Sequence, residues 1–493
     1  MKSLEIYQNY IDGKFVNSES GKTFASINPS NGKILGYFQE SNKNDLDKAI
    51  KSAWNGFKIW SNIPAPKRGE ILLDVAKLLK QNKDRLSKLV SIEMGKVLSE
   101  ASGDVQEAID VFEYMAGEGR RLFGVTTPSE LRNKFCMTIR RPIGVTALIT
   151  PWNFPIAIPA WKISASLICG NSILFKPSSD TPLCAVELIK ILEESGLPCG
   201  VINLITGKGE EIGNEIIKNK NINLISFTGS KDVGEFILKN ASMKRIGLEL
   251  GGKNAIIVMD DANLDLAVDG IIWGGFGTCG QRCTAASRVI VHKYIKKELE
   301  ERLLKRTKKL RLGDPLKEGI DIGPLVAERA VQKVDFYVNS GKKEGARLLC
   351  GGKRGDKVGF FYEPTIFTNV RKEMRIAKEE IFGPVISIIS ANDLNEAIEI
   401  CNSVEYGLVS SIYTENIKNA FEAIEKTDTG LTYVNSSTIG SEVHLPFGGV
   451  KGTGNGTREG GILGIDEFSE VKTVYIDYSG HLQKAQIDLF KMK

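Results

Sequence analysis

From Gly144 onward, short runs of β-branched and apolar residues alternate with segments of helical spacing. Strands are expected at 145–149, 172–175, 201–205 and 224–227, and the helices between them at 182–195, 210–218 and 232–240. Strands and helices that alternate in this way build a parallel sheet covered by helices. The sequence therefore predicts an α/β fold with a doubly wound parallel sheet.

The alternation continues beyond Gly252, which indicates a second α/β unit in series with the first. Further strands are expected at 288–292, 346–350, 408–414 and 430–434, and helices at 295–310, 336–345, 394–401 and 420–426. Residues 45–120, before the first unit, have helical periodicity. The boundary between the units falls near Gly251, and a last alternating run at 471–478 predicts a terminal strand with an open edge, which favours a subunit contact.

Composition excludes several classes of function. The 65 basic and 60 acidic residues are interleaved, without the basic block that is typical of nucleic-acid binding. The uncharged run 143–161 contains three prolines, so it predicts strand, loop and helix start rather than a membrane helix. No secretory segment is visible at the N-terminus, and eight scattered cysteines favour a reducing cytoplasm. With three histidines in the chain, neither His-based catalysis nor a metal site is expected.

Cys283 is the candidate nucleophile. It follows an apolar helical run and a glycine-rich turn, where exposed backbone N–H groups would favour the reactive thiolate. The residue pattern alone leaves two alternatives open, a buried structural cysteine and a metal clip with Cys279, for which a single C-x₃-C is weak evidence.

Two further polar residues have the character of catalytic groups. Glu249 stands between leucines at a strand end, where a buried acid acts as a base with raised pKa, although a solvent-facing glutamate is the alternative. Asn153 lies in a loop between two prolines, and an amide held there could donate to an oxyanion. Lys176 leaves a strand end, and the turn at Gly229 and Ser230 joins a strand to a helix, as in nucleotide sites.

Seven motifs in order carry a family resemblance. They are PWNFP at 151–155, KPSS at 176–179, FTGS at 227–230, LELGGKN at 248–254, GQRC at 280–283, EEIFGP at 379–384 and PFGG at 446–449. Together they span most of the chain, and the sequence closely resembles the NAD(P)-dependent aldehyde dehydrogenase superfamily. Parts of it are similar to the α-aminoadipic semialdehyde branch and others to 2,5-dioxopentanoate dehydrogenases.

The resemblance implies a role for each catalytic candidate. Cys283 would attack the aldehyde to form a thiohemiacetal, and Asn153 with the Cys283 backbone N–H would hold the oxyanion. After hydride transfer, Glu249 would activate the water that hydrolyses the thioester to a free acid. Residues implied in cofactor binding are Ile149, Pro151, Trp152, Lys176, Ser178, Ser179, Gly209, Gly213, Gly229, Ser230, Leu250, Glu380 and Phe382.

Two positions bear on specificity. Members that prefer NAD carry an acid three residues after the motif lysine, where this chain has Ser179, so NADP should be at least tolerated. Arg282, beside the nucleophile, is implied to anchor a distal carboxylate of the substrate, with Glu107, Thr284, Phe447 and the loop 435–444 nearby. The alternative for Arg282 is a structural ion pair that turns it away.

The family fold implies four parts. They are an NAD(P)-binding domain of Rossmann type at 1–119 and 142–250, a catalytic domain at 251–445, an oligomerisation β element at 120–141 and 470–493, and a segment at 446–469 that returns to the cofactor domain. Family members are typically homodimers or homotetramers with a small aldehyde as substrate. Alternative activities are non-phosphorylating glyceraldehyde-3-phosphate oxidation, broad aliphatic aldehyde oxidation and, from another class, cysteine-dependent (thio)ester hydrolysis.

Overall fold

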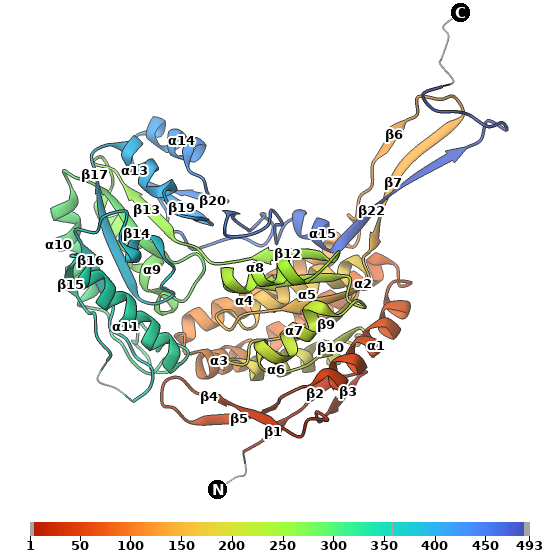
Figure 1. Cartoon of the computed structure of the whole chain (residues 1–493), viewed down its shortest axis with the longest axis horizontal. Coiled ribbons are helices and arrows are strands. Elements are labelled where there is room, and N and C mark those ends of the chain that lie inside the picture. Colours follow the sequence, from red (N-terminus) through yellow and green to blue (C-terminus); the bar gives the residue numbers. More distant parts are fainter. Residues whose placement is uncertain (1–3, 356–357, 488–493) are drawn as a thin grey trace, which may run out of the picture.

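A computed structural model describes residues 4–355 and 358–487, and its largest features are two seven-stranded sheets, each flanked by helices (Figure 1). The first sheet has the order β12-β11-β8-β9-β10-β2-β3. Its strands are β2 (Asn9–Ile11), β3 (Lys14–Val16), β8 (Val145–Ile149), β9 (Ser172–Lys176), β10 (Ile202–Leu204), β11 (Leu224–Thr228) and β12 (Arg245–Glu249). Strands β8 to β12 run parallel, which confirms the predicted sheet.

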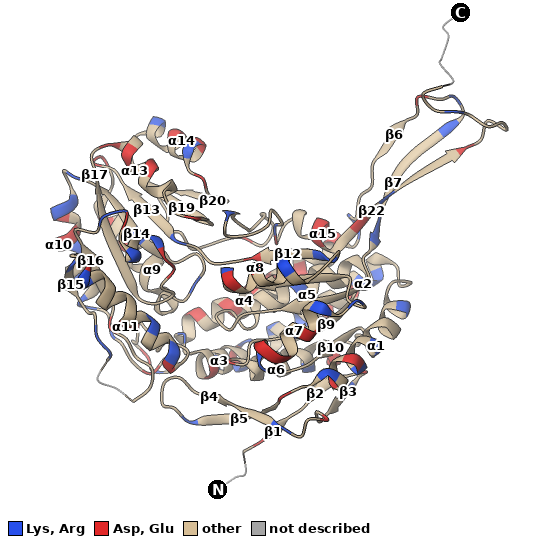
Figure 2. Ribbon diagram, viewed as in Figure 1, with Lys and Arg blue, Asp and Glu red and all other residues tan. Residues whose placement is uncertain are grey.

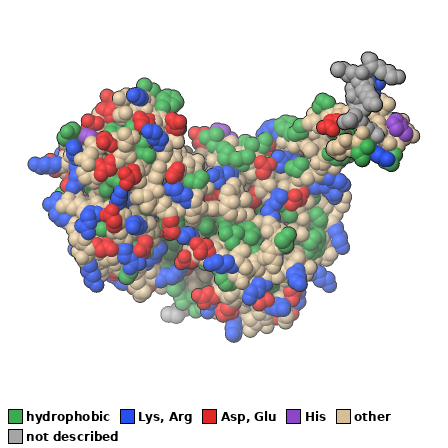
Figure 3. Space-filling view, turned by 45° about the horizontal axis from the view of Figure 1, so that its top comes forward, with side chains coloured by type: hydrophobic (Ala, Val, Ile, Leu, Met, Phe, Trp, Pro, Cys, Tyr) green, Lys and Arg blue, Asp and Glu red, His purple; other side chains and the backbone are tan. Residues whose placement is uncertain are grey.

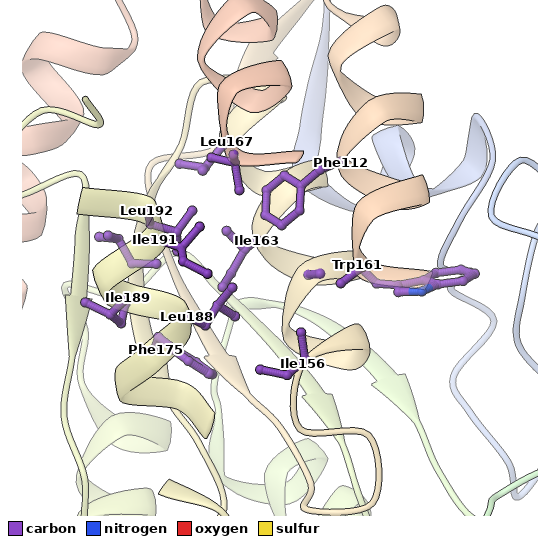
Figure 4. Packing of buried hydrophobic residues seen from close by; sticks show 14 of the residues in the cluster. Phe112, Ile156, Trp161, Ile163, Leu167, Phe175, Leu188, Ile189, Ile191 and Leu192 are labelled. Atoms are coloured by element: carbon purple, nitrogen blue, oxygen red, sulfur yellow. The ribbon is translucent and has the colours of Figure 1, made fainter. Parts of the chain in front are cut away.

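The helices of this half include the predicted helical region before Gly144. They are α1 (Lys43–Trp60), α2 (Ala65–Gln81), α3 (Lys83–Met94), α4 (Leu98–Glu118), α5 (Ala157–Cys169), α6 (Pro182–Glu194), α7 (Asn214–Lys218) and α8 (Lys231–Asn240). Helix α5 is apolar around most of its circumference and is buried almost throughout. Its residues Ile163 and Leu167 lie in one cluster with Phe112 of α4 and Leu192 of α6 (Figure 4).

The second sheet has the order β15-β16-β17-β14-β13-β19-β20 and is parallel except at β15. Its strands are β13 (Asn254–Val258), β14 (Ala286–His292), β15 (Arg347–Cys350), β16 (Thr365–Thr368), β17 (Val385–Ala391), β19 (Val409–Tyr413) and β20 (Leu431–Val434). Its helices are α9 (Leu264–Phe276), α10 (Lys296–Thr307), α11 (Glu328–Lys343), α12 (Arg375–Lys378), α13 (Leu394–Asn402) and α14 (Ile417–Lys426). The predicted second α/β unit is therefore confirmed.

A narrow arm projects from the body of the molecule (Figure 1). It contains β6 (Thr126–Pro128), β7 (Lys134–Pro142) and the terminal strand β22 (Ser469–Asp477). Strand β22 pairs antiparallel with β7 from Ser469 opposite Pro142 to Asp477 opposite Lys134. The terminal strand thus has a partner in the hairpin expected at 120–141.

The chain crosses back from the second sheet to the first before it enters the arm. Leu250 N–H, at the end of the first sheet, donates to Thr453 O at 2.7 Å, and helix α15 (Leu463–Phe468) packs against α5. A short ladder of β18 (Tyr406–Gly407) and β21 (Val450–Lys451) lies on this path. These contacts place the return segment on the first half of the molecule.

The sequence made no prediction of strands before residue 45. The structure adds β1 (Ile6–Tyr7), β4 (Thr23–Ile27) and β5 (Ile34–Gln39) as a small sheet, and β2 and β3 extend the first large sheet at one edge. The ends of the segments expected at 1–119 and 470–493 include residues 1–3 and 488–493, which lie outside the described residues.

Charged side chains of both signs are interspersed over the elements (Figure 2), and the surface mixes them with hydrophobic side chains, some of which lie on the arm (Figure 3). Within residues 4–355 and 358–487, no helix combines the length and the apolar character that crossing a membrane requires.

We expect the substitution Phe112→Ala to lower the free energy of unfolding by about 3–5 kcal/mol, because it opens a cavity in the α4–α5–α6 core. Urea denaturation of the purified protein measures this change. The matched control is Leu73→Ala on the exposed side of α2, for which a change below about 1 kcal/mol is expected. Equal effects of the two substitutions would contradict this description of the core.

Candidate active site

Cys283 and Glu249 line one cavity of about 310 Å³ at the junction of the two sheets. Its wall is formed by α4, by the start of α5, by the strand end at Glu249, by the segment that contains Cys283 and by residues 439–441. Of the residues implied in substrate binding, the wall includes Arg282, Glu107, Thr284 and Phe447. The structure therefore brings these substrate candidates together with two of the three catalytic candidates.

The nucleophile segment is held against the connection between the sheets. Asn254, the first residue of β13, donates from Nδ2 to Cys283 O at 2.7 Å and to Ala285 O at 3.0 Å. A Cβ atom on Gly252 would lie 2.6 Å from Cys283 O, so this position requires glycine. The backbone of Cys283 is thus fixed by the residues that join the two sheets.

The expectation that backbone amides make Cys283 a thiolate is wrong for this structure. Burial raises the pKa of the Cys283 thiol to about 12, the negative charges of Glu380 and Glu249 add to the rise, and the Thr284 backbone N–H opposes it. Burial has the larger effect on this pKa, because the thiolate loses more solvation energy on burial than one hydrogen bond from an N–H group restores. The thiol is therefore protonated at neutral pH and needs a base or a nearby positive charge to react.

Glu249 is the last residue of β12 and is 4% exposed. Its Oε1 atom has no hydrogen-bond partner among the described residues. Burial raises the pKa of Glu249 well above its ordinary value, Glu459 raises it further, and Lys162 opposes the rise. The acid is buried rather than turned to solvent, and its raised pKa makes it a stronger base than an ordinary carboxylate.

Asn153 lies next to the nucleophile segment rather than in the cavity wall. Its Nδ2 donates to Gln281 O at 3.1 Å, and its side chain is buried. One of the two amide hydrogens remains available, and Oδ1 has no partner within the described part of the chain. An amide held in this way is preorganised as a donor close to Cys283.

Arg282 combines the two readings that the sequence left open. It lines the cavity, yet its Nη2 lies 3.5 Å from Glu100 Oε1 and its Nε donates to Thr278 Oγ1 at 2.8 Å. The guanidinium also lies over the rings of Phe154 and Trp273, at 5.3 and 4.9 Å from their centroids. Arg282 is therefore ion-paired and available to the cavity at the same time.

Glu107 and Phe447 shape the wall around Trp161. Glu107 Oε1 accepts from Trp161 Nε1 at 2.9 Å, and the Phe447 ring meets the indole edge at 6.0 Å. Burial raises the pKa of Glu107 to about 7, and the charge of Asp104 contributes to the rise.

Sequence reasoning missed Glu100 and Asp104, which line the cavity one helical turn apart on the same face of α4 as Glu107. The acids at spacings of four and three residues were the signal that could have found them.

The residues implied in cofactor binding lie mainly at the carboxyl ends of the parallel strands. Lys176 ends β9, is buried, and donates from Nζ to Pro177 O at 3.1 Å, while burial lowers its pKa to about 8. Ser178 Oγ accepts from Asp180 N–H at 3.2 Å, and Ser179 beside it is half-buried. The buried Lys176 ammonium has one neutral hydrogen-bond acceptor in the protein, Pro177 O. It is therefore suited to bind a ligand that supplies further acceptors, such as ribose hydroxyls.

The remaining cofactor candidates extend along the same edge. Gly229 and Ser230 precede α8, and Ser230 caps it, so the backbone N–H groups of the first turn can meet a phosphate. Glu380 Oε1 accepts from Gly252 N–H at 2.9 Å, and Phe382 meets Trp152 edge to face at 5.5 Å. Ile149 ends β8, Pro151 follows it, Gly209 and Gly213 bound a short π-helix, and Leu250 also lines the cavity. This donor and acceptor set fits a dinucleotide at the carboxyl edge of the sheet.

Comparison with known proteins agrees with this geometry. Residues 15–474 match the model of the aldehyde dehydrogenase family. The chain is 42% identical to an alpha-ketoglutarate semialdehyde dehydrogenase of Haloferax volcanii, over 96% of this chain and 99% of that protein. It is 40% identical to a D-glyceraldehyde dehydrogenase (NADP(+)) of Picrophilus torridus, over 98% and 99% of the two chains.

A solved structure extends the similarity to the fold. Betaine aldehyde dehydrogenase of Staphylococcus aureus, crystallised with NAD+, superposes with a TM-score of 0.95 at 36% identity, over 98% of this chain and 96% of that one. The chain belongs to the aldehyde dehydrogenase family. The expected family, the α/β aldehyde dehydrogenase fold, the oxidoreductase class and the use of a nicotinamide dinucleotide are therefore confirmed.

The raised pKa of the Cys283 thiol predicts how the cofactor-free enzyme reacts with iodoacetamide. Because the thiolate fraction grows as the pH approaches the pKa, alkylation of Cys283 should accelerate by about tenfold per pH unit from pH 7 to pH 10. Peptide mass spectrometry measures the rate, and Cys283→Ser identifies the signal. The exposed Cys199 reports general access of the reagent. A rate that levels off below pH 8 would contradict the raised pKa.

Proposed function

We propose that this enzyme oxidises a carboxylate-bearing semialdehyde to the free acid through Cys283. The observation that carries the proposal is one cavity whose wall contains the Cys283 thiol, the buried acid Glu249 and the guanidinium of Arg282. The Haloferax volcanii relative supports an aldehyde with a distal carboxylate, because the alpha-ketoglutarate semialdehyde in its name, which is the same compound as 2,5-dioxopentanoate, carries one. The retained cofactor-site residues favour dehydrogenation over simple (thio)ester hydrolysis.

The chemistry follows from the residues around the thiol. Cys283 Sγ passes its proton to Glu249, which releases it to solvent, and the thiolate bonds to the aldehyde carbon. The free amide hydrogen of Asn153 and the Cys283 N–H stabilise the oxyanion. The chemistry that bound NAD(P)+ supplies is hydride acceptance, which leaves a thioester on Cys283. Glu249 then takes a proton from water as the water oxygen attacks the thioester, and the acid leaves as Cys283 recovers its proton. The unpartnered Oε1 of Glu249 supports this role.

Lys176 and Glu380 are proposed to hold the ribose hydroxyls of the cofactor, Gly229 and Ser230 its pyrophosphate, and Trp152 with Phe382 to border the nicotinamide. The other residues of the cofactor set would complete the contacts along the strand ends.

A panel of aldehydes tests the proposed function. It pairs plain aliphatic aldehydes with their ω-carboxylate analogues and includes glyceraldehyde and glyceraldehyde-3-phosphate. Formation of reduced nicotinamide that requires Cys283 and favours the carboxylates would support the proposal, and an equal response to both series would overturn the substrate class.

The division into cofactor domain, catalytic domain and oligomerisation element expected from the sequence is part of this proposal. We propose a homodimer or homotetramer in which the arm contacts a neighbouring subunit. Exposed apolar side chains on β22, among them Val471 and Tyr475, support this role of the arm. The eight free thiols support a reducing, cytoplasmic setting.

Ser179 predicts the choice of cofactor. With no carboxylate to repel a 2′-phosphate, kcat/KM with NADP+ should be at least equal to that with NAD+. The substitution Ser179→Glu should shift the ratio toward NAD+ by about tenfold or more, because like charges would meet at the phosphate. Steady-state kinetics with both cofactors measures the ratio, and Ser195→Glu, at the end of α6 and outside the cofactor set, is the control. A strong preference of the unchanged enzyme for NAD+ would contradict the prediction.

Arg282→Ala should lower kcat/KM for 2,5-dioxopentanoate by about 10- to 100-fold, the range for a lost hydrogen bond to a charged group. A plain aliphatic aldehyde of similar length should lose much less, because it has no carboxylate to pair. Arg282→Lys should recover part of the difference by keeping the charge. The anchoring role fails if Arg282→Ala reduces both substrates by the same factor.

A further inference from the structure

Three acids on one face of α4 each hold a different part of the active-site wall. Glu100 accepts from Thr278 N–H, Asp104 Oδ1 accepts from the N–H of Ala157 at the start of α5, and Glu107 accepts from Trp161 Nε1. Asp104 and Glu107 thus meet α5, while Glu100 alone of the three meets the segment that leads to Cys283. Its contacts identify a residue that sequence reasoning did not single out.

The segment that Glu100 meets has an unusual backbone. Thr278 and Cys279 adopt left-handed conformations with φ values of 52° and 56°, and Gly280 follows with a φ of 68°. A β-branched residue such as threonine disfavours this region strongly, so surrounding contacts must hold it there. Cys283 lies three residues beyond this strained turn.

Both carboxylate oxygens of Glu100 accept hydrogen bonds from Thr278 in this turn. Its Oε1 accepts from Thr278 N–H at 2.8 Å, and its Oε2 accepts from Thr278 Oγ1 at 3.3 Å. The same hydroxyl accepts from Arg282 Nε at 2.8 Å, and Arg282 Nη2 lies 3.5 Å from Glu100 Oε1. The hydroxyl of Thr278 therefore connects the acid on α4 to the residue that immediately precedes the nucleophile. Glu100 is buried, so these contacts are shielded from water.

We propose that Glu100 is a positioning residue for Cys283: it holds the strained Thr278–Gly280 turn and, through Thr278, fixes the guanidinium of Arg282. Glu100 lines the cavity but takes no part in proton or hydride transfer. The inference rests on the aldehyde oxidation proposed above and not on its substrate, since the contacts it depends on are within the protein.

The test compares Glu100→Ala and Glu100→Gln in the full-length enzyme with a plain aliphatic aldehyde and NADP+. Glu100→Ala should lower kcat by about 10- to 100-fold, as expected for lost hydrogen bonds to a charged group, with little change in KM. Glu100→Gln keeps an acceptor for Thr278 N–H and should stay within about threefold of the unchanged enzyme. Glu113→Gln, on the exposed side of α4, is the matched control and should have no effect.

Alkylation of Cys283 by iodoacetamide in the cofactor-free enzyme gives a readout that needs no turnover. Release of the turn should make the half-buried thiol more accessible, so Glu100→Ala should alkylate several-fold faster while its kcat falls, and Glu100→Gln should reverse both changes. If the unchanged enzyme oxidises no aldehyde but this alkylation pattern holds, the proposed function fails and the positioning role stands. Unchanged kcat and unchanged alkylation in Glu100→Ala would overturn the inference.

A double-mutant cycle distinguishes release of the turn from other effects of removing Glu100. Thr278→Gly removes both the hydroxyl and the penalty for a left-handed backbone, so the turn no longer needs Glu100. The loss of kcat caused by Glu100→Ala should therefore shrink to less than about threefold in the Thr278→Gly background. Losses that simply multiply would show that Glu100 and the turn act independently, which also overturns the inference.

Discussion

The geometry of the site depends on the four residues 250–253, which carry the chain from the last strand of one parallel sheet to the first strand of the other. Glu249 ends β12 on one side of this connection, and Asn254 begins β13 on the other, where it holds the carbonyl of Cys283. Gly252 between them donates to Glu380 and leaves no room for a Cβ against Cys283 O. The proposed base, the proposed nucleophile and a proposed cofactor contact are thus fixed by one short segment, which leaves little freedom for their relative placement.

The second constraint is the number of acids that the cavity buries. Five carboxylates line its wall, and Arg282 is the one basic side chain among the described lining residues; the acids are Glu100, Asp104, Glu107, Glu249 and Glu459. Lys96 pairs with Asp104 and Lys162 with Glu459, behind the wall. Burial raises the pKa of Glu107 to about 7, so its protonated form reduces the negative charge that a carboxylate substrate would meet. Burial also raises the pKa of Glu249 and keeps the Cys283 thiol protonated.

Much of the fold was predictable because hydrophobic periodicity is a local property. The strands β8 to β11, the helical character of residues 45–120 and the second α/β unit follow from spacing along the chain, and the motifs singled out Cys283, Glu249 and Asn153. The strands before residue 45 escaped because each is short and is completed by partners far away in sequence, as when Tyr10 of β2 pairs with Leu204 of β10. The raised pKa of Cys283 and the hydrogen bond from Thr278 N–H to Glu100 could not be predicted for a related reason. Desolvation and long-range contacts exist only in the folded chain.

The account stands on a thioester at Cys283 that Glu249 helps water to remove, and trapping that thioester tests it most directly. The Glu249→Gln enzyme would be mixed with 2,5-dioxopentanoate and NADP+, quenched in acid within one turnover, and its peptides analysed by mass spectrometry. The account predicts an acyl adduct on the peptide that contains Cys283, formed together with one equivalent of NADPH and accumulating far above the level in the unchanged enzyme. Formation of NADPH with no adduct on Cys283, or with an adduct on another residue such as Cys279, would contradict it.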